Sequence, residues 1–133
     1  MHAEKIIDTK NFTLIYYPEE KIIHHTFHDY VYGNILRSYL HEGVRIMKEH
    51  SATKWLSDDR DNPTLSPADV DYGKDIWVSK AIEAGWKYWA LILPGAVIGK
   101  SSMSGLLDFV SDKGVVVEFF NDTDEAFAWL NKQ

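Results

Sequence analysis

The chain has 133 residues, with 14 basic and 20 acidic side chains and a formal net charge of −6, and it shows no basic patch that would suit nucleic acid. It has no cysteine, which excludes thiolate nucleophiles, thiolate metal sites and disulfide bonds and fits a reducing compartment. No apolar run approaches about 20 residues, so we expect no membrane span. The early charged residues also argue against a secretory signal. We therefore expect a single cytoplasmic domain over residues 1–133.

The N-terminal quarter predicts an antiparallel hairpin. Residues 11–17 and 22–27 are rich in β-branched and aromatic side chains, and the polar segment 18–21 between them is typical of a tight turn. Residues 4–8 are suited to a short additional edge strand. We therefore expect the sheet to begin with antiparallel strands.

A long helix and a third strand are predicted next. Asp29 is a suitable cap for a helix that runs to about Glu49, because apolar residues recur there at spacings of three and four. Gly43 lies on the apolar side of this helix, so we expect it to allow a close approach to the sheet. Residues 53–57 then predict a strand, which an acidic loop ends.

The rest of the chain alternates helices with apolar strands. Ser66 and Pro67 suit the cap and first position of a helix that runs to about Ala84 and ends at Gly85. The remaining predicted elements are a strand at 86–93 covered on both faces, a helix at 100–112, a buried strand at 115–120 and a helix at 124–132. The order β-β-α-β-α-β-α-β-α predicts an α/β fold with one mixed, mostly parallel sheet and right-handed crossovers.

This order of elements resembles the STAS domain, the fold of the sporulation anti-sigma-factor antagonist. It is more closely similar to the small stand-alone bacterial SpoIIAA-like proteins. The residues that carry the resemblance are FTLIYYPEEKIIHHTF, KWLSDDRDNPTLSP, AIEAGWKYWALILP and VEFFNDTDEAFAWL, together with the helix from Asp29, and they span about the whole chain. The resemblance implies a non-enzymatic regulatory module that binds a protein partner and forms a homodimer. STAS-like folds also resemble lipid-binding folds, which implies a small apolar-ligand carrier as the alternative.

Ser66 has two candidate roles. In the antagonist proteins, a phosphorylatable serine lies at the helix N-terminus that follows the third strand, and Ser66 occupies the matching position. Free N–H groups and the helix dipole would stabilise a phosphate there. The family pattern is Ser-Ser-Gly, whereas this chain has Pro67 and Ala68 after the serine, and Asp69 would repel the phosphate. Helix capping already accounts for Ser66, so we expect capping to be its main role.

The acidic loop Asp58, Asp59, Arg60 and Asp61 is our best location for a binding surface, because open α/β sheets bind ligands at the carboxyl ends of their strands. The loop lacks the glycine and the glutamate that a calcium-binding loop requires. A looser Mg²⁺ site and an enzyme that acts through Asp58, Asp59 and Ser101 are further alternatives. The plainer interpretation is a solvated loop in which Arg60 pairs with a neighbouring carboxylate.

Gly99, Lys100 and Ser101 form a candidate anion or ligand loop at a helix N-terminus. The segment resembles a phosphate-binding loop, but only three residues separate its glycines, whereas four are needed. We therefore do not expect nucleotide hydrolysis.

Two clusters of aromatic and imidazole side chains also call for an interpretation. His24 and His25 would point to opposite faces of a strand, so we expect no zinc site there. We also expect no other cofactor, and we expect these histidines to lie at the surface or on an edge strand. By the same alternation, Trp86 and Tyr88 should share one face of a strand and Trp89 the other. We expect these aromatic residues and Trp55 to pack in the core. The alternatives are an apolar pocket or a dimer surface, with contributions from Tyr16, Tyr17 and Phe27.

Overall fold

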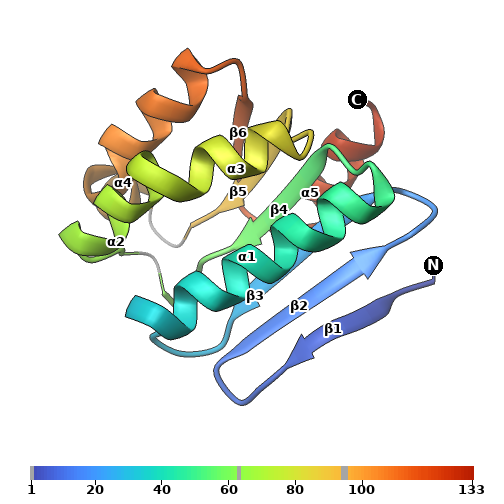
Figure 1. The fold of residues 1–133 in the computed structure, drawn as a ribbon, viewed down its shortest axis with the longest axis horizontal. Coiled ribbons are helices and arrows are strands. Elements are labelled where there is room, and N and C mark those ends of the chain that lie inside the picture. Colours follow the sequence, from blue (N-terminus) through green and yellow to red (C-terminus); the bar gives the residue numbers. More distant parts are fainter. Residues whose placement is uncertain (1, 63, 94–95) are drawn as a thin grey trace.

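The computed structural model describes residues 2–62, 64–93 and 96–133, and for 96–103 it describes the backbone alone. The described residues form a six-stranded sheet in which spatial order follows chain order (Figure 1). Its strands are β1 (Glu4–Asp8), β2 (Phe12–Tyr17), β3 (Ile22–Phe27), β4 (Lys54–Asp58), β5 (Tyr88–Ile92) and β6 (Val116–Phe120). The pairs β1–β2 and β2–β3 are antiparallel, and the three following pairs are parallel. The prediction of a mixed α/β sheet that begins with a hairpin is therefore confirmed.

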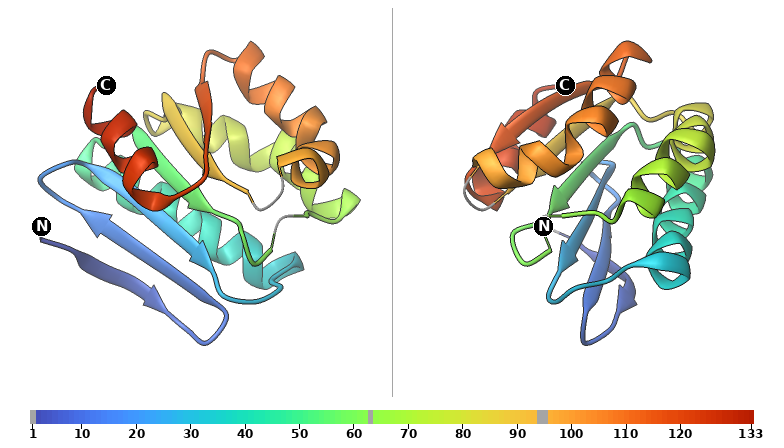
Figure 2. Two further views of the ribbon diagram at one scale, coloured as in Figure 1. Left: turned by 180° about the vertical axis from the view of Figure 1, so that it is seen from behind. Right: turned by 90° about the vertical axis from the view of Figure 1, so that its left-hand side faces the viewer.

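The helices divide unequally between the two faces of the sheet. They are α1 (Gly33–His50), α2 (Pro67–Tyr72), the π-helical turn η1 (Gly73–Trp77), α3 (Val78–Glu83), α4 (Ala96–Asp112) and α5 (Thr123–Asn131). The segments α2, η1 and α3 make one continuous helix. That helix, α1 and α4 cover one face, and α5 lies on the other (Figure 2). The parallel strands advance in one direction across the sheet, so right-handed crossovers place their helices on the same face.

The long helix α1 begins at Gly33, not at Asp29. The Asp29 carboxylate instead accepts a hydrogen bond from the Tyr30 N–H at 2.7 Å. The first N–H of α1, from Gly33, donates to Asp69 of α2 at 3.1 Å. A residue 36 positions away therefore supplies the cap, which local sequence patterns do not reveal.

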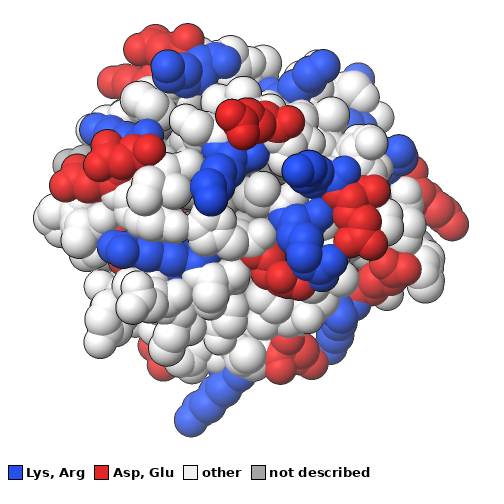
Figure 3. All heavy atoms as spheres, in the orientation of Figure 1, with Lys and Arg blue, Asp and Glu red and all other residues white. Residues whose placement is uncertain are grey.

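On the outer face of α1, basic and acidic side chains are interspersed (Figure 3), and Arg45 pairs there with Glu42 and Glu49.

Gly43 brings α1 close to the sheet, as predicted. A Cβ atom at this position would overlap the ring carbons of Trp55 on β4. The six-membered part of that indole therefore occupies the place where any other residue would carry its side chain. This contact fixes Trp55 between α1 and the helix η1–α3.

Strand β6 differs from its prediction as a buried strand. It is an edge strand, and the side chains of Val116 and Phe119 are 48% and 38% exposed. The apolar sequence VVVEFF predicts a strand, but it carries no information on whether neighbours flank the strand on one side or both. The apolar side chains of α5 pack mainly over β4 and β5, where Leu130 is fully buried.

His24 is buried on the α5 side of the sheet, so its prediction as a surface or edge histidine is wrong. Strand β3 lies inside the sheet between β2 and β4. The two ring nitrogens of His24 lie 3.4 Å from the Tyr17 hydroxyl and 3.3 Å from the Thr26 hydroxyl. Burial, together with a smaller effect of the neighbouring His25, lowers the pKa of His24 from 6.5 to about 4. The imidazole is therefore neutral in the folded protein at neutral pH.

We expect His24→Gln to remove much of the protein's acid sensitivity. A histidine with a lowered folded-state pKa contributes stability that is complete above pH 6.5 and is lost as pH falls towards 4. The interval between 6.5 and about 4 corresponds to about 3 kcal/mol. Urea unfolding at pH 7.5 and pH 4.5 should show a wild-type loss that exceeds that of the variant by about 2–3 kcal/mol. Equal losses in the two proteins would contradict the neutral, buried state of His24.

Candidate functional site

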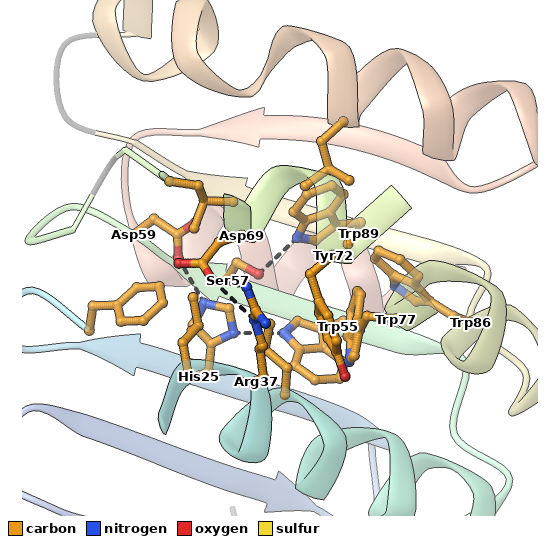
Figure 4. A pocket seen from close by; sticks show the side chains of 16 residues that line it. His25, Arg37, Trp55, Ser57, Asp59, Asp69, Tyr72, Trp77, Trp86 and Trp89 are labelled. Carbon is orange, nitrogen blue, oxygen red and sulfur yellow. Dashed lines mark hydrogen bonds and ion pairs between the residues drawn. The ribbon is translucent and has the colours of Figure 1, made fainter. Parts of the chain in front are cut away.

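A cavity lies between the multi-helix face of the sheet and the helices α1, η1 and α4 (Figure 4). We call it the tryptophan cavity, because Trp55, Trp77, Trp86 and Trp89 line it. The space that the centre of a water-sized sphere can occupy is about 60 Å³. One water molecule needs about 10–15 Å³ by this measure, so the cavity has room for about four to six. Almost all of its accessible wall is apolar.

Four different local structures bring the tryptophans together. Trp55 and Trp89 are direct partners in the parallel β4–β5 register and therefore share a face. Trp77 ends the π-helical turn, and Trp86 lies two residues before β5. The ring centroids of Trp77 lie 5.4 Å from those of Trp55 and 5.1 Å from those of Trp86, and Trp86 lies 5.3 Å from Trp89. Each neighbouring pair therefore lies at a distance typical of aromatic packing.

The prediction that Trp86 and Trp89 occupy opposite faces is wrong. It applied strand alternation to Trp86, but β5 begins only at Tyr88. Tyr88 does occupy the other face, where its ring contacts Trp129 of α5. The alternatives of core packing and an apolar pocket both apply to these aromatic residues, because the buried indoles are themselves the wall of the cavity.

The hydrogen bonds of the four indoles differ. Trp55 Nε1 donates to His25 Nδ1 at 2.9 Å, and Trp89 Nε1 donates to the Ser57 hydroxyl at 2.8 Å. The Nε1 atoms of Trp77 and Trp86 are buried and have no hydrogen-bond partner among the described residues. A buried donor without an acceptor costs about 1–3 kcal/mol. These two unpaired indole N–H groups therefore make the wall of the cavity energetically costly.

His25 and Asp59 form a buried pair at the cavity. Asp59 Oδ1 lies 2.7 Å from His25 Nε2. Asp59 is 5% exposed and His25 is 4% exposed. Because an indole nitrogen can only donate, the hydrogen bond from Trp55 requires His25 Nδ1 to be an acceptor. The imidazole proton is then on Nε2, which donates it to Asp59. This arrangement describes a neutral histidine beside an ionised carboxylate.

Burial raises the pKa of Asp59, and the charge and hydrogen bond of His25 oppose that shift. A protonated Asp59 would have to donate to His25 Nε2, which would move the imidazole proton to Nδ1. Two N–H groups, from His25 and Trp55, would then face each other across 2.9 Å. The indole therefore favours the ionised carboxylate that burial disfavours.

Ser57 adds a hydroxyl to the pair, but the three residues do not form a catalytic triad. Such a triad requires the serine hydroxyl to donate to an imidazole nitrogen. Trp55 and Asp59 occupy the two nitrogens of His25, and Ser57 accepts from Trp89. Sequence reasoning missed this grouping because His25 and Ser57 meet only through the β3–β4 register.

Polar contacts between α1 and α2 border one edge of the cavity. The buried carboxylate of Asp69 accepts from Arg37 Nε at 3.3 Å as well as from the N–H of Gly33. The guanidinium of Arg37 lies 4.4 Å from the centre of the Tyr72 ring, whose hydroxyl is hydrogen-bonded to His41. These contacts tie the first turns of the two helices together.

The acidic loop is divided between the two faces of the sheet. Asp58 faces α5 and binds Arg60 at 2.7 and 2.9 Å, as the plainer interpretation predicted for Arg60. Burial acts to raise the pKa of Asp58, but the hydrogen bonds and charge of Arg60 outweigh it and lower the pKa. Asp59 lines the cavity, and Asp61 is exposed. Of the four predicted residues, Asp59 is the one that belongs to the cavity.

The other predicted site residues lie apart from the cavity or outside the described side chains. Ser66 caps α2, and its hydroxyl accepts from the N–H of Asp69 at 3.2 Å; its phosphorylation remains a prediction. Helix α4 begins at Ala96, four residues earlier than predicted. Gly99, Lys100 and Ser101 therefore lie within its first turns, and their side chains are outside the described residues.

No family model, curated protein or solved structure matches the chain. Within the described part of the chain, no three His, Asp or Glu side chains come close enough to hold a metal ion. The helices of that part include none that is long and apolar enough to cross a membrane.

Proposed function

We propose that the protein binds a small molecule with a largely apolar surface in the tryptophan cavity. The observation that carries the proposal is the cavity itself, an apolar space of about 60 Å³ walled by four indole rings. Protein cores normally pack closely, and side chains that face a void forfeit dispersion contacts. A bound molecule would restore those contacts.

The π-helical turn Gly73–Trp77 supports the same proposal. Turns of this kind are rare, are energetically unfavourable within an α-helix and are frequent at functional sites. This one places Gly73 and Trp77 at the cavity wall. A π-helical turn contains one residue more than an α-helical turn. Without that extra residue, the residues after the turn would lie at different angles about the helix axis, so the π-helical turn helps to form the wall.

We expect tert-butanol to bind in the cavity and Leu36→Phe to prevent this. Leu36 is buried on α1 and lines the cavity, so a larger ring there would occupy the space. The indole N–H signals of the five tryptophans in an NMR titration provide the measurement. The four cavity signals should move in the wild-type protein, and that of Trp129, on the α5 side, should not.

The matched control is Leu130→Phe, the same exchange in the buried cluster under α5. It should cost stability through overpacking and keep the cavity signals responsive. If no small probe with an apolar surface moved the cavity signals of the wild-type protein, or if tert-butanol moved them equally in Leu36→Phe, the proposed function would fail.

A STAS-like assignment of the fold is part of this proposal. The opening hairpin, the alternation of helices with parallel strands and the serine-capped helix after β4 support it. Phosphate on Ser66 of protein isolated from its own cells would favour an antagonist-type switch. Unmodified protein that carries a small molecule would favour the ligand-binding function.

A protein-interaction module is the second candidate function. Three apolar side chains around the start of α1 favour it, because Tyr30, Tyr32 and Ile35 are about half or more exposed and the two tyrosine rings stack at 5.1 Å. Exposed aromatic groups are enriched at protein interfaces. Sedimentation of the purified protein tests the homodimer form of this candidate, which a concentration-independent monomer would exclude.

A further inference from the structure

We infer that the ligand of the tryptophan cavity is a compact organic cation, such as a methylated ammonium group. This inference rests on the proposed function and adds the charge of the molecule to it. It is carried by the balance of charges around the cavity, by the indole faces and by the apolar wall.

The described charged side chains around the cavity sum to one negative charge. Asp59 and Asp69 contribute two negative charges and Arg37 one positive charge, and all three line the cavity. Arg37 is paired with Asp69 at 3.3 Å. Asp59 faces His25, which the hydrogen bond from Trp55 keeps neutral. The charge that remains is therefore that of Asp59, inside the protein and without a described cation beside it.

The tryptophan rings offer a second means of attracting a cation. The faces of indole rings carry partial negative charge, and tryptophan is the aromatic residue that attracts cations most strongly. Four tryptophans and Asp59 line one small space. A cation that contacted these ring faces would be attracted by them as well as by the charge of Asp59.

The apolar wall distinguishes an organic cation from a metal ion. Metal ions such as Mg²⁺ and Ca²⁺ require several oxygen ligands, and no described group of three His, Asp or Glu side chains is positioned to hold one. Methyl groups around a nitrogen would instead contact the apolar wall. A space of about 60 Å³ suits a molecule of about five non-hydrogen atoms, roughly the number of water molecules that it would displace.

Tetramethylammonium and tert-butanol, each with five non-hydrogen atoms, form a matched pair of probes that differ in charge. The cavity indole signals give the affinity for each, with sodium chloride holding the ionic strength constant. We expect tetramethylammonium to bind the wild-type protein at least tenfold more tightly than tert-butanol. Asp59→Asn removes the charge and keeps the hydrogen-bond acceptor for His25, so it should reduce this preference at least tenfold.

The outcomes separate the two proposals. Equal affinities of the wild-type protein for the two probes would overturn the cationic ligand and leave small-molecule binding intact. No response of the cavity signals to either probe would overturn both. A preference for tetramethylammonium that persisted in folded Asp59→Asn would also overturn the inference, because it assigns the preference to Asp59. If that variant does not fold, the ratio of the two affinities in the wild-type protein still tests whether the cavity prefers a cation.

Discussion

Gly43→Ala is expected to destabilise the protein by about 2 kcal/mol, although alanine favours a helix over glycine by about 1 kcal/mol. The new methyl group would overlap the ring of Trp55. That ring has little freedom to move, because its Nε1 is bonded to His25 at 2.9 Å and Trp77 packs against it at 5.4 Å. Denaturant unfolding of the variant and the wild-type protein measures the loss.

Gly105→Ala in α4 is the matched control. Among the described residues, a Cβ there would meet Lys74 alone, with its Nζ atom at 2.9 Å, and the end of a flexible side chain can move aside. This variant should be as stable as the wild-type protein or gain about 0.5–1 kcal/mol from the better helix former. Equal effects of the two exchanges would contradict the close contact between α1 and Trp55.

His25→Phe is expected to cost about 3–5 kcal/mol, the usual effect of leaving a buried charge without its partner. The substitution takes the donor from Asp59 and the acceptor from the indole of Trp55. The cost should grow as pH rises, because burial raises the pKa of Asp59 and its ionised form is the one left unpaired. Unfolding should therefore be measured at pH 6 and pH 8.

The double variant His25→Phe with Asp59→Leu should recover about 2 kcal/mol or more of that loss. Apolar side chains of suitable size replace buried charged pairs at little cost, and the double variant leaves no unpaired carboxylate. A double-mutant cycle isolates the coupling between the two positions. Additive effects would show that His25 and Asp59 do not act as a pair.

The elements that the sequence predicts correctly are those with local causes. The hydroxyl of Ser66 accepts from an N–H group only a few residues away, and an apolar run bounded by Gly85 and Pro94 marks β5. The close approach at Gly43 also follows from its place on the apolar side of α1. These features depend on spacing along the chain and can be predicted from it.

The features that sequence reasoning missed depend on residues far apart in the chain. Asp69 caps α1 from α2, and His25 meets Asp59 across 34 positions. The edge position of β6 follows from the order of the whole sheet. Asp59 was predicted within a binding loop, but its partner and its role at the cavity arise from the parallel register of β3 and β4.

A crystal structure under xenon pressure tests the central claim most directly, because xenon enters apolar cavities and is located from its scattering. The account predicts a xenon atom among Trp55, Trp77, Trp86 and Trp89 in the wild-type protein, and none at this position in Leu36→Phe. Wild-type crystals without xenon at these rings, or the same xenon position in both proteins, would contradict a ligand-binding tryptophan cavity.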